Sequence, residues 1–249
     1  MTTAILSALP QEQAGLFAAL QQPVRLKHAG RHFTSGVLHG QPVVLALSGI
    51  GKVAAATTAT ALIERFGVTR IVFTGVAGGV GDGVNVGDVV VASSYVQHDM
   101  DASPLFARWL VPGYASVCLP CDSPLSALLS GAASAYLQSL SGQFDAKKDA
   151  PRLHQGLMAS GDRFINCPEV SLALRAPLLA AGHDVLAVEM EGAAVAQVCV
   201  DYGVAFAAMR TISDRADATA HVDFAEFIDS VASRYADHIV RNLLQSLPN

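Results

Sequence analysis

Two carboxylates separate an apolar segment from an alanine-rich one in the stretch Val188-Glu189-Met190-Glu191-Gly192-Ala193-Ala194. The apolar residues of 184–189 predict a buried strand, and the alanine-rich residues that follow predict a helix, so the two acids fall at the turn between them. Open α/β sheets bind their ligands at the carboxyl ends of strands. Acids in this position indicate a role in chemistry rather than in solubility.

Two further acids occupy the same kind of position. Asp214 ends the stretch Met209-Arg210-Thr211-Ile212-Ser213-Asp214, which continues a predicted strand, 204–211, and Glu12 follows a predicted first strand, 4–9. We therefore expect Glu12, Glu191 and Asp214 to gather at one edge of the sheet. Two alternatives stay open: Glu12 alone is typical of an exposed acid in the first turn of a helix, and the alternation of Glu189 with Glu191 means that only one of them needs to face a ligand.

Strands and helices alternate along the chain. This order predicts an α/β fold, and the length and composition of the chain fit one domain, 1–249. The polar stretch 142–152 is predicted to be a surface insertion. Apolar periodicity predicts strands over 4–9, 32–38, 42–48, 70–74, 88–93, 154–159, 184–189 and 204–211, and helices over 10–21, Lys52–Phe66, Ser123 to about Leu140 and about Val222 to Leu247.

Composition excludes several classes of partner. The chain has 249 residues, 51% of them apolar and 15% charged, which is enough apolar material for a large core. Its formal net charge of −5 comes without a basic cluster, which argues against DNA or RNA as a partner. The first residues lack a basic segment, and their apolar run is too short for a signal peptide or a membrane span, so a cytoplasmic protein is expected.

Cysteine and glycine patterns exclude common cofactor sites. Cys118 and Cys121 form a Cys-x-x-Cys pair, but no second pair completes a zinc site, and a structural role is expected. The stretch 48–52 resembles a P-loop, yet its first glycine would fall at Ala46 and no hydroxyl residue follows the lysine. Residues 75–81 lack the ordered glycines of a dinucleotide site. The two glycine-rich turns either let a ligand approach the backbone or are simply turns.

Taken together and in order, the motifs resemble those of the 5′-methylthioadenosine/S-adenosylhomocysteine nucleosidases. The resemblance implies the three-layer fold of the purine nucleoside phosphorylase and hydrolase superfamily, a twisted mixed β-sheet surrounded by α-helices in a single domain, and a homodimer. It also implies hydrolysis of the N-glycosidic bond of a 5′-modified adenosine to adenine and a 5-thio-substituted ribose, with no metal and no organic cofactor. The motifs are Ala8–Glu12, Ser48–Ala56, Thr74–Gly79, Gly87–Val91, His98–Asp101, Ser160–Asn166, Val188–Glu191 and Ile212–Asp214.

The resemblance assigns roles to the three acids. Asp214 matches the acid that protonates adenine N7, which needs a pKa raised by burial. Glu12 matches the base that activates water, and Glu191 matches the acceptor of hydrogen bonds from the ribose hydroxyls. Two carboxylates with opposite duties suit this bond, because the base leaves with negative charge while the sugar becomes positive.

The remaining site residues are also implied by the resemblance. Phe164 would stack on adenine and Arg210 would lie near the water and the sugar, although core packing for Phe164 and an ion pair for Arg210 stay open. Met190 would pack beneath the ribose, the backbone of Ile165 would contact the base and Ser213 would orient Asp214. Substrate contacts are further expected from Ala77 and Gly78, and an apolar 5′ pocket from Leu9, Ile50, Leu105, Phe106, Pro112 and Phe224.

One residue departs from the family pattern. Val76 stands where the family often has a small hydroxyl residue, which leaves the substrate preference and the rate open. The same residue argues against a phosphorylase, whose site commonly holds phosphate with a serine or threonine in this turn. A phosphorylase, a nucleosidase acting on aminodeoxyfutalosine and a silent nucleoside-binding module are the alternative functions. The apolar residues of the 101–112 loop, Leu105, Phe106, Trp109 and Leu110, predict a dimer.

Overall fold

Apolar residues alternate between the two faces of the central strands in the computed structural model, which describes residues 1–140, 150–216, 227 and 231–248. In β1 (Thr3–Ser7), Ala4 and Leu6 pack into one hydrophobic core and Ile5 into another. In β5 (Arg70–Phe73), Phe73 packs into the same core as Ala4 and Leu6, and Val72 packs into the same core as Ile5. Strands that are apolar on both faces need helices on both sides of the sheet.

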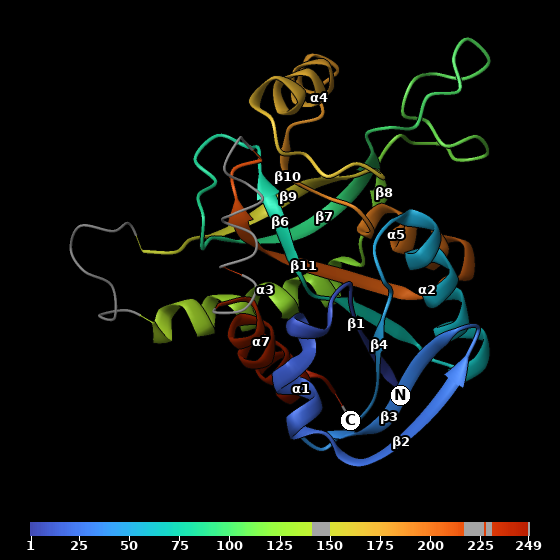
Figure 1. Cartoon of the computed structure of the whole chain (residues 1–249), viewed down its shortest axis with the longest axis vertical. Coiled ribbons are helices and arrows are strands. Elements are labelled where there is room, and N and C mark those ends of the chain that lie inside the picture. Colours follow the sequence, from blue (N-terminus) through green and yellow to red (C-terminus); the bar gives the residue numbers. More distant parts are fainter. Residues whose placement is uncertain (141–149, 217–226, 228–230, 249) are drawn as a thin grey trace.

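Helices cover both faces of the sheet and make three layers (Figure 1). Helices α2 (Lys52–Phe66) and α5 (Gly192–Tyr202) pack against each other on one face. Helices α1 (Ala14–Ala19), α3 (Ser123–Ser139) and α7 (Ser233–Ser246) share the core on the other face. Helix α4 (Pro168–Ala180) stands apart and contacts the strand β10 (Val185–Glu189). The predicted α/β architecture is confirmed.

Strand β11 (Ala205–Asp214) joins the two halves of the sheet. Its first half pairs with β5, and its second half pairs with β6 (Val76–Gly79) and β7 (Val89–Gln97). The second half of the sheet thereby closes into a ring, because β6, β10, β9 and β7 pair in series. The remaining strands are β2 (Gln21–His28), β3 (Arg31–Leu38), β4 (Gln41–Leu47), β8 (Leu119–Pro120), β9 (Leu153–Ser160) and β10 (Val185–Glu189).

Two predicted features differ from the structure, and three of its elements, β2, β8 and α4, were not predicted. The helix expected over 10–21 is the 3-10 turn η1 (Pro10–Gln13) followed by α1, and the chain then forms β2, whose residues are all exposed and therefore carry no burial pattern. Helix α4 was not predicted, and β6 was expected to be a turn. The helix expected from about Val222 to Leu247 is described in part, as α7 (Ser233–Ser246). Most of the predicted insertion, residues 142–149, lies outside the described residues.

Candidate active site

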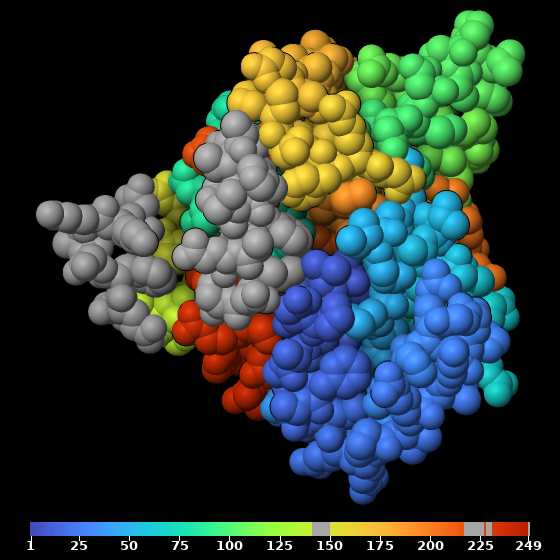
Figure 2. Space-filling model, viewed as in Figure 1, coloured from blue at the N-terminus to red at the C-terminus, as the bar shows by residue number. Residues whose placement is uncertain are grey.

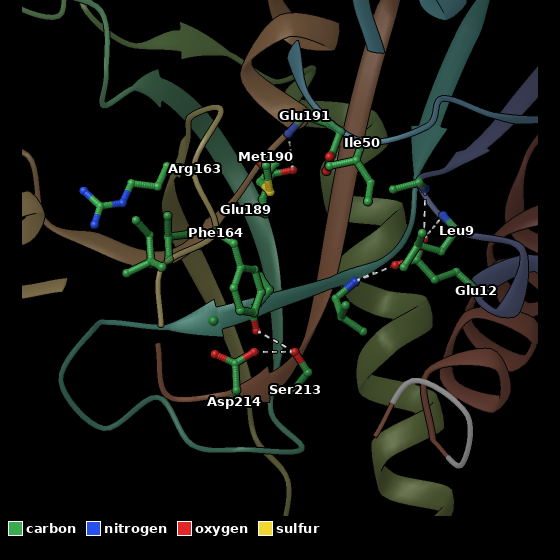
Figure 3. A pocket seen from close by; sticks show the side chains of 16 residues that line it. Leu9, Glu12, Ile50, Arg163, Phe164, Glu189, Met190, Glu191, Ser213 and Asp214 are labelled. Atoms are coloured by element: carbon green, nitrogen blue, oxygen red, sulfur yellow. Dashed lines mark hydrogen bonds between the residues drawn. The ribbon is translucent and has the colours of Figure 1, made fainter. Parts of the chain in front are cut away.

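A cavity of about 430 Å³ lies where β1, β10 and β11 end. Figure 3 shows Glu12 and Asp214 at opposite ends of this cavity, with Met190 and Glu191 along one side. The three acids expected at one edge of the sheet therefore meet in a single pocket. Its lining is Ala8, Leu9, Glu12, Ile50, Val76, Ala77, Gly78, Arg163, Phe164, Ile165, Val188, Glu189, Met190, Glu191, Ser213 and Asp214.

Glu12 is only 2% exposed, so it is not the exposed helix acid that its position alone suggests. Its Oε2 accepts hydrogen bonds from the backbone N–H groups of Ala8 and Leu9, both at 2.9 Å, and its Oε1 accepts one from Val76 at 3.2 Å (Figure 3). Burial raises the pKa of Glu12 above its ordinary value of 4.5, against the opposing effects of these bonds and of Arg210. A carboxylate fixed in this way is suited to accept a proton.

Gly75 and Gly78 make room for the carboxylates of Glu12 and Asp214. A Cβ atom on Gly75 would lie 2.9 Å from Oε1 of Glu12, and one on Gly78 would lie 2.9 Å from Oδ1 of Asp214. Carbon atoms do not approach oxygen this closely without displacing it. The glycine-rich segment that follows β5 therefore lets the acidic side chains lie against the backbone, which is a more specific role than a simple turn.

Asp214 is the last residue of β11 and is 2% exposed. The Ser213 hydroxyl donates to its Oδ2 at 2.8 Å, and the backbone N–H of Ala216 donates to its Oδ1 at 2.8 Å. Ser213 also lies 3.4 Å from the carbonyl oxygen of Ala77 (Figure 3). The carboxyl group is thus held in one orientation, as expected for Ser213 from the sequence.

Glu189 and Glu191 both reach the cavity wall but have different partners. Glu191 accepts a hydrogen bond from the backbone N–H of Gly51 at 2.9 Å. Glu189 accepts hydrogen bonds from the Ser160 hydroxyl and from the Gly192 N–H, the latter at 2.8 Å. Burial, followed by the negative charge of Glu189, raises the pKa of Glu191. Because Glu189 is already bonded to Ser160 and Gly192, Glu191 is the acid of this pair that is left to bind a ligand.

Arg210 forms the ion pair that the sequence left open. Its Nη2 lies 2.6 Å from Oε2 of Glu189, its guanidinium lies 4.1 Å from the ring centroid of Phe73, and its side chain is 1% exposed. Arg210 is not among the lining residues of the cavity. A buried guanidinium needs a carboxylate partner, so this residue acts behind the pocket wall rather than on the sugar.

Phe164, Ile165 and Met190 line the cavity, and Figure 3 shows Phe164 and Met190 between Glu12 and Asp214. The Phe164 side chain is 41% exposed, which excludes core packing as its role, whereas Ile165 is buried. The sequence did not single out Arg163, Val188 or Glu189 as wall residues. Their positions inside the quoted motifs, next to Phe164 and Met190, are the signal that could have identified them.

The residues expected to form a 5′ pocket are divided. Leu9 and Ile50 line the cavity, and Phe224 lies outside the described residues. Leu105, Phe106 and Pro112 lie away from the cavity of their own chain, on a loop that projects from the body of the molecule (Figures 1 and 2).

Trp109 differs from its apolar neighbours in the 101–112 loop because it is buried within its own chain. Its side chain is 8% exposed and its ring packs edge-on against His183, with 6.4 Å between centroids. The Arg108 guanidinium lies 4.9 Å from the Trp109 ring centroid. The large apolar side chains that the loop exposes are therefore those of Leu105 and Phe106.

Within the described ranges, no group of three or more His, Cys, Asp or Glu side chains is placed to hold a metal ion. Cys118 and Cys121 flank the short strand β8 and are both free thiols. Burial raises the pKa of Cys121 to about 12, so this thiol stays protonated. That environment agrees with the structural role expected for the pair.

Replacing Glu191 with glutamine is expected to stabilise the ligand-free protein at neutral pH and above. Because the pKa of Glu191 is raised, the folded state holds this proton more tightly than the unfolded chain does. The associated stability is fully present below the ordinary pKa of 4.5 and is lost as the pH rises through the raised pKa. Thermal unfolding should give similar Tm values for both proteins at acid pH and a widening advantage for Glu191→Gln as the pH rises. A gap that is independent of pH would contradict this account.

Comparison with known proteins places this geometry in a family. Residues 2–245 match the model of the phosphorylase superfamily. The 5′-methylthioadenosine/S-adenosylhomocysteine nucleosidase of Mycobacterium bovis is 35% identical and covers 100% of this chain and 97% of its own. The enzyme of that name from Neisseria meningitidis, solved with methylthio-immucillin-A, superposes with a TM-score of 0.87 at 34% identity, covering 99% of both chains. Futalosine hydrolase of Helicobacter pylori superposes with a TM-score of 0.84 at 30% identity, covering 99% of this chain and 98% of that one. The chain belongs to the phosphorylase superfamily and, within it, to the 5′-methylthioadenosine/S-adenosylhomocysteine nucleosidase family.

Proposed function

We propose that this protein hydrolyses the N-glycosidic bond of 5′-thio-substituted adenosines, releasing adenine and the 5-thio-substituted ribose. The observation that carries the proposal is the pair of buried carboxyl groups, Glu12 and Asp214, at opposite ends of one cavity with Glu191 between them. The family relationship supports this activity. Neither a metal nor an organic cofactor has a part in the proposed reaction.

The three acids divide the reaction between them. Asp214 donates a proton to adenine N7 as the bond between C1′ and the base breaks and its electron pair moves onto the base. Glu12 removes a proton from water, whose oxygen forms the new bond to C1′. Glu191 accepts hydrogen bonds from the ribose hydroxyls and stabilises the positive charge that develops on the sugar. The hydroxyl of water thereby becomes part of the sugar product. Glu12 then releases its proton to solvent and Asp214 takes one up, which restores both groups for the next turnover.

The wall residues around the acids fit a nucleoside. Phe164 stacks on the adenine ring, and Ile165, Ala77 and Gly78 lie against the base in this proposal. Met190 packs beneath the ribose, between Phe164 and Glu191 (Figure 3). Base and sugar are then held between the general acid and the general base.

Water suits the site better than phosphate does. The Val76 side chain, near Glu12, offers no hydroxyl group, and its N–H already bonds to the carboxylate. Among the described lining residues Arg163 is the only cationic side chain, and it lies on the Phe164 side of the cavity, away from Glu12 (Figure 3). A phosphate ion beside Glu12 would meet a carboxylate, and the Arg210 guanidinium, whose charge acts on Glu12 from behind the wall, is already paired with Glu189.

The pocket is expected to prefer a thioether over the 5′-hydroxyl of adenosine. An unpaired hydroxyl buried near Leu9 and Ile50 costs roughly 1–3 kcal/mol, which corresponds to about 5- to 150-fold in kcat/KM. Adenine release from methylthioadenosine and from adenosine measures this ratio directly. Equal kcat/KM values for the two substrates would show that the apolar residues do not contact the 5′ group.

A homodimer is expected to complete the 5′ side of the pocket. Leu105 and Phe106 are 83% and 45% exposed on the projecting loop, and Ile50, at the pocket, is 60% exposed. Exposed apolar groups of this size favour an interface with a second chain. Sedimentation at micromolar protein should give about twice the 25.9 kDa of one chain. A monomer would mean that one chain builds the whole pocket.

A second substrate class has one specific observation in its favour, the similarity to futalosine hydrolase. Aminodeoxyfutalosine is also a 5′-modified adenosine, so the roles of Glu12, Glu191 and Asp214 would be unchanged. The difference lies in the 5′ pocket, where a bulky polar substituent would replace a small thioether. Comparing kcat/KM for the two nucleosides decides between them.

We also propose a cytoplasmic location, which the four free thiols of the chain support because reducing compartments keep cysteines unpaired. In the described part of the chain, no helix is long and apolar enough to cross a membrane. Fractionation of the source cells with assay of adenine release tests the location.

A further inference from the structure

A polar cluster joins three loops beside the active-site cavity. The Lys52 Nζ lies 2.6 Å from Oδ1 of Asp99, and the Lys52 backbone N–H donates to Oδ1 of Asp162 at 2.8 Å. The backbone N–H of Asp162 in turn donates to Oδ2 of Asp99 at 2.9 Å. The cluster therefore links the start of α2 to the segments that follow β7 and β9.

This cluster borders the pocket through Gly51. The residue before Lys52 donates its N–H to Oε1 of Glu191 at 2.9 Å. A Cβ atom on Gly51, whose φ is +94°, would lie 3.1 Å from Oδ1 of Asp162. The Asp162 carboxylate thus contacts the Gly51–Lys52 peptide group, and Glu191 contacts the preceding peptide group, Ile50–Gly51.

The segment of Asp162 is itself held against its neighbours. A Cβ atom on Gly161 would lie 2.3 Å from the His98 ring, so the loop packs directly on this side chain. The backbone N–H of Gly161 donates to the Glu189 carbonyl at 3.2 Å. The Asp162 carboxylate is consequently a fixed acceptor rather than a freely rotating surface group.

We propose that Asp162 is a positioning residue that, through the Lys52 backbone N–H, directs the Gly51 N–H at Glu191 and keeps Glu191 in the form that binds the ribose hydroxyls. The part that concerns ribose rests on the function proposed above. Asp162 does not touch the substrate in this account. It acts on the substrate through two peptide groups and one carboxylate.

The charged and titratable groups that face Glu191 determine the direction of the effect. Glu189 and Glu12 favour its protonated form, whereas Arg210 and the Gly51 N–H favour the carboxylate, and the buried Tyr95 lies close enough to interact with it. Loss of the Gly51 bond removes a group that lowers the pKa of Glu191. At a given pH, less Glu191 would then be ionised and able to accept both hydroxyls.

The test compares Asp162→Ala with Asp162→Asn, because asparagine keeps an oxygen acceptor for the Lys52 N–H. For Asp162→Ala we expect kcat/KM for methylthioadenosine to fall about 10-fold or more, mainly through KM, and the acid limb of its pH profile to move to higher pH. Asp162→Asn should retain most of the wild-type profile. Asp82→Ala, which removes an exposed partner of Arg175, is the matched control. It should leave kcat/KM and the acid limb of its pH profile unchanged.

Three outcomes would overturn the proposal: an acid limb that stays in place for Asp162→Ala, an asparagine variant as impaired as the alanine variant, or the same shift in Asp82→Ala. If Asp162→Ala does not fold, Asp99→Ala removes the acceptor on the other side of the cluster. It should move the limb in the same direction.

A readout without substrate separates this proposal from the proposed function. In the ligand-free protein, Asp162→Ala should lose more stability as the pH rises, because the pKa of Glu191 is raised further. In a Glu191→Gln background the same substitution should have an effect that is independent of pH. If the wild type cleaves no nucleoside but this coupling is observed, the proposed function fails and the positioning role stands. Absence of the coupling contradicts the positioning role alone.

Discussion

Replacing Glu12 with glutamine is expected to lower kcat at least about 100-fold while substrate binding survives. Glutamine matches the shape of glutamate, and its oxygen can still accept hydrogen bonds from the N–H groups of Ala8 and Leu9. An amide, however, cannot take a proton from water. Single-turnover release of adenine, together with equilibrium binding of an uncleavable nucleoside analogue, separates the loss of chemistry from a loss of affinity.

A matched substitution controls for the chemical change itself. Glu169 lies on the exposed surface at the start of α4, so Glu169→Gln should leave kcat unchanged. If Glu12→Gln keeps more than about a tenth of the wild-type kcat, Glu12 is not the general base.

The second large effect is expected for Asp214→Asn, which removes the acid that protonates adenine. We expect a loss of at least about 100-fold with methylthioadenosine, because the base leaves poorly without a proton. The loss should be much smaller with a 4-nitrophenyl riboside, whose leaving group does not need protonation. The ratio of the two losses is the diagnostic quantity, since it cancels any general effect on folding or on ribose binding.

Two results bear on this assignment. Asp184→Asn, at an exposed ion pair with Arg175, should affect neither substrate. Equal losses on both substrates for Asp214→Asn would indicate a structural role, in which the carboxyl only anchors the Ser213 hydroxyl and the Ala216 N–H.

Sequence patterns predicted the fold best where burial imposes a period. Helix α2 was predicted with the bounds that the structure has, because its small apolar residues repeat on one face and Gly51 and Gly67, both at positive φ, flank it. Strand β2 was missed because all its residues are exposed, so that no periodicity marks it. Its partner β3 supplies the backbone hydrogen bonds that make it a strand.

The sequence predicted the positions of the three acids of the site but not the residues that bind to them. The acids could be located because each follows a strand, and the resemblance to a known family assigned their roles. The partners of those acids depend on packing between distant segments. Arg210 pairs with Glu189 across 21 positions of the chain, and Gly51 reaches Glu191 across 140. No local pattern contains such pairs.

In the loop 101–112, too, contacts with distant segments determine what the local sequence does not show. Its run of apolar residues predicted a cluster that covers a second chain, yet Trp109 turns back into its own chain and contacts His183 and Arg108. Which apolar side chain of a loop is buried depends on the surface beneath it. Leu105 and Phe106 remain as the part available to a partner.

The most direct test of the proposed mechanism is the identity of the sugar formed from methylthioadenosine in the presence and absence of phosphate. We predict the same rate of adenine release in both conditions and free 5-methylthioribose as the sugar product, detected by mass spectrometry. This result would show that water, activated at Glu12, is the nucleophile. A requirement for phosphate, with a sugar 1-phosphate as the product, would contradict the account and make the protein a phosphorylase.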